Sequence, residues 1–386
     1  MNRSYSEKCF YRCWAEVDLA ATTHNVRVLR GMAGPDRLLM ICVKARAYGH
    51  GLVPVAKAAL AGGADRLCVA YVDEGVELRQ AGIKCPIQLL LEPQVSSAAD
   101  LHHYNLIPTL SSPKLVQRLS ELLTEPLTIQ VEVDTGMTRV DLKPKDVVSF
   151  LNMVKSTGKF KVEGIFSHFS NSHVANDPVS RVITLNQLKS FLETLANCRK
   201  AGHQFALTHI ASSGAVVHYP EAYLDMIRSG FLVHGIPRSW IHLPLKPALS
   251  WKSRVKSVFK VSGGQGVGYE RSYITPHNTT LATVACGYAD GYPHQLSSGT
   301  EVLIQGRRAR VVGRVGMNQM VVDVDHIDQI EIGNEVVLIG TQGENSITAN
   351  DLAKQVGTTP ADIVCKISMC VPRVYLSDLS ENGSVW

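Results

Sequence analysis

The sequence predicts an α/β protein in which an N-terminal (β/α)8 TIM-like barrel is followed by a C-terminal, mostly-β domain. Two observations predict this. In the first part of the 386 residues, short apolar, β-branched runs alternate with amphipathic stretches, which is typical of parallel sheets. After about residue 243, strand patterns follow one another with turns between them. We place the barrel at 12–242 and the second domain at 243–386, with a linker near 244–247, and expect residues 1–11 to pack with the second domain.

Eight apolar runs in the first part are interpreted as barrel strands. They span 38–44, 67–70, 87–91, 107–110, 127–134, 162–168, 206–211 and 225–228. Amphipathic patterns between them predict helices, among them 53–61, 73–81, 112–123, 145–157 and 180–201. Eight such units favour a closed barrel. The alternative is an open doubly wound sheet, but the glycine-rich stretch at 263–268 does not lie inside a βαβ unit.

The second part of the chain predicts a different architecture. Strands are expected at 248–261, 279–285, 301–304, 308–315, 320–324 and 335–339, and one helix at 349–356. Glycine-containing turns such as Gly291-Tyr292-Pro293 and Gln305-Gly306 separate the strands. This pattern indicates a β-rich domain.

Composition excludes several classes of protein. A chain with 45% hydrophobic and 19% charged residues has enough apolar surface to fold, which excludes global disorder. The net charge of +5 comes from scattered Lys and Arg, which does not favour nucleic-acid binding. The first eight residues lack an apolar signal core, and no run reaches the ~18 apolar residues of a membrane span. The nine cysteines show no CxxC pair, so we expect reduced thiols, no metal site and a cytoplasmic protein without a membrane partner.

Several predicted barrel strands end in a polar side chain, where a barrel enzyme carries its active site. Lys44 closes the first strand, Arg139 follows the fifth, and His168 ends the sixth. The seventh and eighth end in Ser212-Ser213 and in Arg228. Burying the Lys44 ammonium at a strand end is costly unless it is paired or neutralised. Covalent attachment to an aldehyde cofactor would solve this, and a lysine that reaches solvent is the alternative.

The stretch VKARAYGHG at 43–51 resembles the cofactor-lysine signature of the fold-type III pyridoxal-phosphate racemases, the alanine racemase family. Further motifs similar to that family follow in the family's order and cover nearly the whole chain. They lie at 14–19, 133–139, 164–169, 227–230, 268–269, 287–291, 312–319 and 371–373. The resemblance implies racemisation of a small amino acid, with L-alanine to D-alanine as the leading reaction.

The family implies a two-base mechanism with pyridoxal 5'-phosphate as cofactor. Lys44 would bind the cofactor covalently and act as one base, and Tyr269 of the other subunit of a homodimer would act as the opposite base. A tyrosine with an ordinary pKa of about 10 needs neighbours that stabilise its phenolate. His168 and Arg228 would form that chain, and Arg228 would also keep the pyridine nitrogen unprotonated.

The remaining roles implied by the resemblance concern binding. The cofactor would contact Tyr48, Leu90, Arg139, His168, Ser212, Ser213, Arg228, Gly230 and Phe231. The substrate would contact Arg139 and, from the partner chain, Tyr288 and Met317. Each residue type also has an ordinary structural role: a histidine can be a core residue, a serine a helix N-cap, and a methionine a packing residue.

Six positions depart from the residues that are usual in the family, namely Arg46, Glu132, Ser212, Gly316, Asn318 and Met369. Glu132 stands where many members carry a carbamylated lysine, and we hypothesise that its carboxylate supplies the negative charge beside Arg139. Gly316 and Met369 bear on the pocket, where one methylene or hydroxyl changes discrimination by only ~1–3 kcal/mol. A serine or broad-spectrum racemase therefore stays an alternative, as does a decarboxylase of the same fold.

Overall fold

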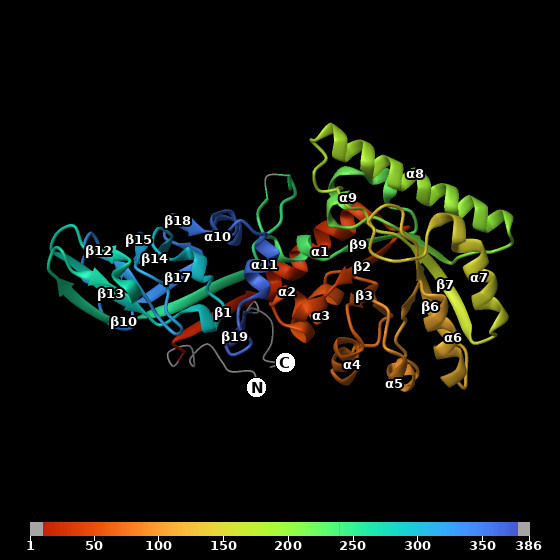
Figure 1. Cartoon of the computed structure of the whole chain (residues 1–386), viewed down its shortest axis with the longest axis horizontal. Coiled ribbons are helices and arrows are strands. Elements are labelled where there is room, and N and C mark those ends of the chain that lie inside the picture. Colours follow the sequence, from red (N-terminus) through yellow and green to blue (C-terminus); the bar gives the residue numbers. More distant parts are fainter. Residues whose placement is uncertain (1–10, 239, 377–386) are drawn as a thin grey trace.

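The computed structural model describes residues 11–238 and 240–376 and has two bodies, a barrel and a β-rich domain joined at its flank (Figure 1). Of the expectation for residues 1–11, all but Tyr11 lies outside the described residues. The predicted fold class is confirmed, and the division after residue 242 stays a prediction.

Eight parallel strands form the barrel, as predicted. They are β2 (Leu38–Cys42), β3 (Arg66–Val69), β4 (Ile87–Leu89), β5 (Thr109–Leu110), β6 (Leu127–Glu132), β7 (Phe160–Phe166), β8 (Leu207–His209) and β9 (Met226–Ser229). They hydrogen-bond as two four-stranded sheets, β4-β3-β2-β9 and β5-β6-β7-β8. A bridge between Gln88 and Ile107 links the sheets at one side, and the Arg228 N–H donates to the Ala211 carbonyl over 2.9 Å at the other. The ring of strands is therefore closed.

Helices cover the outside of the barrel. They are α1 (Leu19–Ala33), α3 (Leu52–Ala61), α4 (Val72–Gln80), α5 (Ala98–His103), α6 (Pro113–Leu122), α7 (Val147–Ser156), α8 (Pro178–Lys200) and α9 (Ser213–His218). Local sequence sets where they begin. Pro178 occupies the first turn of α8 and the Asp177 carboxylate accepts the Ser180 N–H over 2.8 Å, which satisfies a backbone donor at the helix start.

The first strand of the chain, β1 (Cys13–Asp18), belongs to the β-rich domain and not to the barrel. It pairs antiparallel with β10 (Leu249–Val261) and parallel with β19 (Arg373–Leu376). The predicted barrel, which begins at residue 12, therefore differs from the structure over this strand. The sequence predicts no strand over these residues, and a local pattern cannot indicate partners that lie more than two hundred residues away.

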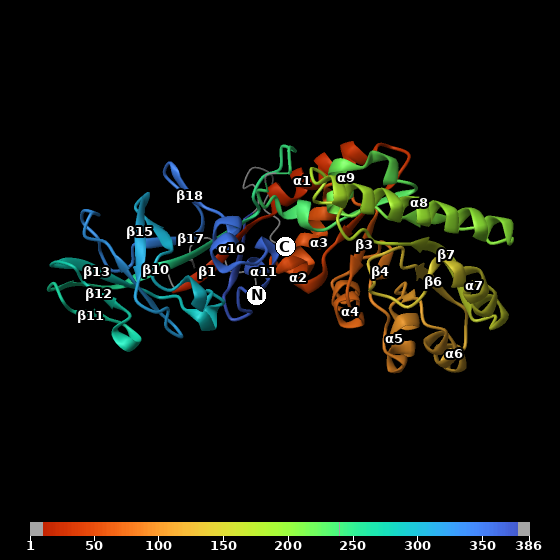
Figure 2. The ribbon, with the colours of Figure 1, turned by 45° about the horizontal axis from the view of Figure 1, so that its top comes forward.

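The second domain is built on a nine-stranded sheet of order β18-β17-β14-β15-β16-β13-β10-β1-β19. Its other strands are β13 (Thr279–Val284), β14 (Glu301–Ile304), β15 (Arg307–Val312), β16 (Met320–Asp323), β17 (Glu335–Gln342) and β18 (Asn345–Ile347). Because β17 also pairs with β10, six strands close around an apolar core that contains Trp251 and Tyr292. A ribbon of β11 (Gly266–Val267) and β12 (Tyr273–Ile274) lies at the end of the molecule remote from the barrel (Figures 1 and 2).

The two bodies meet beside the end of β2. Helix α11 (Pro360–Cys365), which follows α10 (Ala349–Val356), lies against the short helical turn α2 (Lys44–Tyr48) in both views (Figures 1 and 2). A Cβ at Gly49 would lie 2.4 Å from the Val364 carbonyl oxygen, so only glycine fits this approach. Arg373 also donates from Nε to the Gly49 carbonyl over 3.0 Å. The second domain therefore supports the lysine turn directly.

Candidate active site

Lys44 follows β2 and begins a turn of unusual handedness. Ala45, Arg46, Ala47 and Tyr48 all have positive φ, from 51° to 55°, so α2 is a left-handed helical turn. L-residues adopt this conformation at a cost of roughly 1–2 kcal/mol each. Strain of this kind persists where the surroundings impose it, and it is concentrated at functional sites. The turn leaves the half-buried Lys44 and Tyr48 at the carboxyl end of the barrel strands.

A polar cradle lies beside this turn, between the ends of β8 and β9. A Cβ at Gly230 would lie 2.5 Å from the Tyr48 hydroxyl oxygen, so the backbone and the phenol approach closely. The Gly230 N–H donates to the Ser213 Oγ over 3.3 Å, and Ser213 Oγ lies 3.3 Å from Ser229 Oγ. Ser212 caps α9, and Phe231 begins the 3-10 helix Phe231–His234. Hydroxyl and backbone N–H groups therefore gather where an anionic group could bind.

Arg228 lies on β9 at the centre of the barrel mouth and is 4% exposed. One guanidinium nitrogen lies 2.6 Å from Nδ1 of His209, and the other lies 2.9 Å from Nδ1 of His168 and donates to the Ser167 carbonyl over 3.1 Å. Because a guanidinium only donates, both Nδ1 atoms accept, and each neutral ring carries its hydrogen on Nε2. Burial, followed by the charge of Arg228, holds the pKa of both His168 and His209 well below the ordinary value.

An acidic pair orients Arg139, which follows β6. The Arg139 guanidinium contacts the Glu132 carboxylate over 2.6 Å, and the Glu132 side chain is nearly buried. Burial raises the pKa of the neighbouring Asp134, but backbone N–H bonds from Thr138, Gly136 and Arg139 and the Lys143 ammonium outweigh this and lower it overall. Asp134 therefore fixes the loop that turns Arg139 back towards Glu132.

Three predicted residues lie on the second domain and not at the barrel mouth. Tyr269, Tyr288 and Met317 are 75%, 44% and 56% exposed. The Tyr288 N–H donates to the Gly316 carbonyl over 3.1 Å, and Glu270 pairs with Arg314, so the loops that carry the three residues adjoin one another. Strands β11 and β12, which flank Tyr269, lie far from the barrel of the same chain (Figures 1 and 2). One chain therefore holds the predicted site in two separate parts.

Comparisons with known proteins match a family model to each of the two domains. A family model described as the alanine racemase N-terminal domain matches residues 17–237, and one described as the alanine racemase C-terminal domain matches 248–375. The chain belongs to the alanine racemase family. It is similar to the alanine racemase of Halothermothrix orenii, at 38% identity over 368 residues (94% of this chain and 96% of the relative). The alanine racemase of Symbiobacterium thermophilum is 41% identical over 368 residues, with the same coverage of 94% and 96%.

Solved structures agree with this alanine racemase assignment. The alanine racemase of Bacillus anthracis, solved with bound L-Ala-P, superposes with a TM-score of 0.90 at 33% identity and covers 96% of each chain. The alanine racemase of Streptomyces coelicolor superposes with a TM-score of 0.89 at 34% identity, covering 96% of this chain and 100% of that one. The predicted family and enzyme class, an isomerase, are confirmed. The roles of individual residues stay predictions.

Sequence reasoning missed His209, whose Nδ1 lies 2.6 Å from the Arg228 guanidinium. His209 is the last residue of β8, its ring stacks on Phe166 at 4.8 Å, and it is fully buried. Its role depends on the approach of three strands, β7, β8 and β9, which no local pattern records. The one available signal is its place at a strand end.

The predicted departures fall in different environments. Arg46 is exposed and forms an ion pair with Glu77 over 3.2 Å. Asn318 and Met369 are exposed, and Ser212 precedes α9 as its N-cap. Leu90, a predicted cofactor contact and not one of these departures, packs against a buried cluster of Met40, Cys42, Cys68 and Met226.

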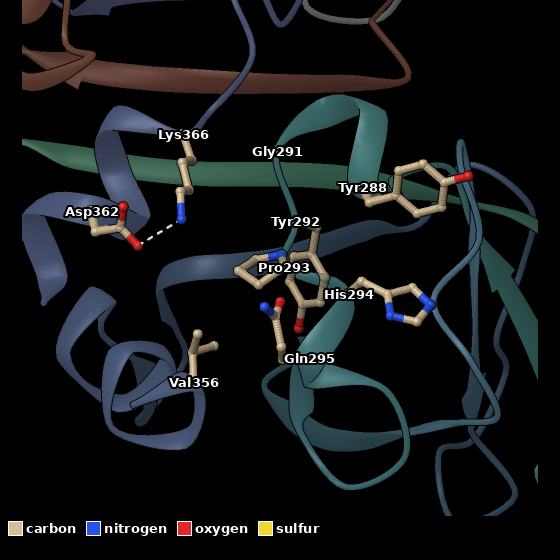
Figure 3. Close-up of a pocket in the computed structure, with 9 residues that line it drawn as sticks. All are labelled: Tyr288, Gly291, Tyr292, Pro293, His294, Gln295, Val356, Asp362 and Lys366. Carbon is tan, nitrogen blue, oxygen red and sulfur yellow. Dashed lines mark hydrogen bonds and ion pairs between the residues drawn. The ribbon is translucent and has the colours of Figure 1, made fainter. Parts of the chain in front are cut away.

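A cavity of about 260 Å³ lies in the second domain (Figure 3). Tyr288 stands at one side with its ring edge-on to His294 at 6.0 Å, and the ion pair between Lys366 and Asp362, 2.8 Å long, stands at the other. Tyr288 is the one predicted site residue among the described residues that line it. This cavity is therefore separate from the polar cradle at the barrel mouth.

Proposed function

We propose that this chain racemises alanine with pyridoxal 5'-phosphate bound at the barrel mouth, and that a homodimer completes each site. Membership of the alanine racemase family over nearly the whole chain supports the reaction. The buried Arg228, held between two neutral imidazoles, favours a racemase over a decarboxylase. A guanidinium stays protonated at neutral pH and can only donate hydrogen bonds. A pyridine nitrogen that faces it therefore accepts a hydrogen bond and stays unprotonated.

The residues at the barrel mouth fit the cofactor. Lys44 would hold its aldehyde carbon, and the hydroxyl and N–H groups around Tyr48, Ser213 and Gly230 would hold its phosphate. Arg228 would face its ring nitrogen. When bound, pyridoxal phosphate withdraws electrons from the substrate Cα and so acidifies the Cα–H bond.

Arg139 would bind next to the phenolic oxygen of the cofactor and to the substrate carboxylate. Its pairing with Glu132 fixes one guanidinium nitrogen and leaves the others to donate. The Glu132 carboxylate offsets part of the positive charge that Lys44, Arg139 and Arg228 gather there. We propose that it is a positioning residue.

Racemisation needs a proton donor or acceptor on each face of the substrate Cα. The Lys44 amine would serve one face. Tyr269 of the partner subunit would serve the other, because Tyr269 of the same chain lies on the remote ribbon. His168 accepts at Nδ1 from Arg228 and therefore carries its hydrogen on Nε2, from which it can stabilise a phenolate. Tyr288 and Met317 of the partner subunit would line the substrate entrance.

Two finer assignments accompany this function. Alanine is the proposed substrate, and serine or a broader range of amino acids is the alternative that Gly316 and Met369 keep open. We also propose a cytoplasmic location, which the free thiols of the described cysteines support. Separately, no helix among the described residues is both long and apolar enough to cross a membrane.

Incubation of the purified enzyme with L-alanine or L-serine in deuterated water tests the proposal. Chiral chromatography and proton NMR should show D-alanine with deuterium at Cα, a slower reaction with L-serine, and none with the Lys44→Ala variant. Release of carbon dioxide without inversion would indicate a decarboxylase instead. Faster turnover of L-serine than L-alanine would overturn the substrate assignment while leaving the reaction class intact.

A further inference from the structure

Two cysteine side chains lie next to each other inside the barrel, just before the lysine turn. Cys42 on β2 and Cys68 on β3 are register partners in the parallel sheet, so both side chains leave the same face. Cys42 and Cys68 belong to one buried cluster, and the residues are 5% and 0% exposed. Met40 and Met226 complete the sulfur-rich cluster, against which Tyr48 and Leu90 pack.

The placement of the two cysteines permits a disulfide. Neighbouring strands lie ~4.7–4.9 Å apart, which is within the Cα separation of roughly 4.4–6.8 Å that disulfides span. The Cβ atoms of register partners stand about one strand spacing apart, wider than the ~3.8 Å mean of relaxed disulfides. Forming the bond must therefore draw β2 and β3 together. A disulfide formed under such strain is easily reduced, which is the property of a reversible switch.

The two thiols differ in the direction of their pKa shifts. The hydrogen bond with Cys68 lowers the pKa of Cys42 against the opposing effect of burial, and the positive charges of Lys44 and Arg228 add to this lowering. Burial, together with the hydrogen bond to Cys42, raises the pKa of Cys68 well above its ordinary value. Cys42 is also the more exposed of the two residues, at 5% against 0%. We therefore assign the attack to Cys42 and the resolving step to Cys68.

We propose that Cys42 and Cys68 form a reversible disulfide when the enzyme meets a peroxide, and that this disulfide inactivates the enzyme. The Cys42 thiolate attacks one oxygen of hydrogen peroxide: a sulfur–oxygen bond forms, the oxygen–oxygen bond breaks, and hydroxide leaves and takes a proton to become water. The Cys68 sulfur then attacks the Cys42 sulfur. The sulfur–sulfur bond forms, the sulfur–oxygen bond breaks, and the Cys68 proton leaves with the hydroxyl group as a second water. Two thiols are thus oxidised and one peroxide is reduced.

Closure of the disulfide would act on the proposed cofactor site through short connections. Lys44 is two residues after Cys42 and lies on the same strand end. A Cβ at Gly230 would lie 3.1 Å from the Cys42 Cβ and 2.5 Å from the Tyr48 hydroxyl oxygen. Cys42 therefore packs directly against the backbone of the polar cradle. A shift of β2 towards β3 therefore displaces Lys44 and Tyr48 together. This inactivation rests on the proposed function, whereas formation of the disulfide does not.

The test exposes the cofactor-loaded enzyme to graded hydrogen peroxide, blocks the remaining thiols by alkylation, and maps the peptides by mass spectrometry. We expect a cross-link between the peptides of Cys42 and Cys68, with a parallel loss of racemisation of about tenfold or more that dithiothreitol restores. Peptide mapping separates this bond from one between Cys13 and Cys286, two buried cysteines of the core of the second domain.

Matched variants distinguish the proposal from general oxidation. Cys68→Ala, with Cys68→Ser as a second variant should the first fold poorly, is expected to lose the reversible inactivation. Cys198→Ala, at a buried thiol on α8, is expected to keep it. A folded enzyme without the cross-link after peroxide treatment, equal reversible inactivation of wild type and both Cys68 variants, or a cross-linked enzyme with full activity would each overturn the proposal. An untreated enzyme that fails to racemise alanine would contradict the proposed function alone.

Discussion

At the scale of single residues, the account depends on how buried charges are paired. Arg139, which we propose binds the substrate carboxylate, forms a salt bridge with Glu132. Replacing Glu132 by glutamine removes the charge and keeps the shape. Because a hydrogen bond between charged groups contributes roughly 1.5–3 kcal/mol, we expect Glu132→Gln to lower kcat/KM for L-alanine about tenfold.

The matched control for this prediction is Glu301→Gln, which removes the carboxylate of an exposed pair with Arg308 on the second domain. Exposed ion pairs contribute little, so its kinetics should equal those of the wild type. Steady-state kinetics of the two variants decide the matter. Wild-type kinetics in Glu132→Gln would show that the carboxylate does not position Arg139.

The residue scale also predicts a pH dependence of stability. His50 and His234 stack at 4.0 Å in the core, and neither ring nitrogen of His234 has a hydrogen-bond partner among the described residues. Burial lowers the pKa of His50 to about 4, and burial with the charge of His50 lowers that of His234. The unfolded chain binds these protons at an ordinary pKa of ~6.5, whereas the folded protein does not. The contribution of these two histidines to the free energy of unfolding is therefore constant above that pH and falls as the pH drops towards 4.

The variant His234→Phe keeps an aromatic ring and cannot ionise. We expect thermal unfolding to show a smaller loss of Tm than wild type between about pH 7 and about pH 5. His277→Gln, at an exposed histidine, should follow the wild-type curve. Identical slopes in all three proteins would show that the stacked pair does not control acid stability.

At the scale of elements, the lysine turn is the feature that sequence could not predict. The apolar run predicts the strand that ends in Lys44, and the stretch 43–51 carries the motif that resembles the family. The left-handed conformation is not predicted, because Ala45, Arg46 and Ala47 individually favour right-handed helix. Tertiary contacts from Gly49 to α11 impose it, and those involve residues more than three hundred positions away. For the same reason, the sequence predicts neither a strand over Cys13–Asp18 nor its place in the second sheet.

A β-branched residue in this turn tests its handedness. Ala45 is exposed with φ of 51°, so Ala45→Val adds strain without changing the core. We expect a loss of about 1–2 kcal/mol in the free energy of unfolding. Ala196→Val, at an exposed position of the right-handed α8, should lose about 0.5 kcal/mol or less. Urea unfolding measures both, and equal losses would contradict a left-handed turn.

At the scale of the whole molecule, the proposed site needs residues from the barrel and from the second domain. Tyr269, Tyr288 and Met317 are exposed on the second domain. The ribbon of β11 and β12 on either side of Tyr269 lies at the end of the molecule remote from the barrel (Figures 1 and 2). The motif at 268–269 marks Tyr269 in the sequence, but only the structure places it between β11 and β12, two strands remote from the barrel of the same chain. The proposed symmetric dimer, with two equivalent sites, would bring the two parts of the site together.

The most direct measurement of this central claim is complementation between two inactive variants. Lys44→Ala and Tyr269→Phe, each inactive alone, are co-expressed with different tags, and the mixed dimer is purified. One of its two sites then carries an intact Lys44 and an intact Tyr269 from different chains. The mixed dimer should recover about half of the wild-type racemase activity per dimer. A mixed dimer as inactive as its parents would contradict a site shared between subunits.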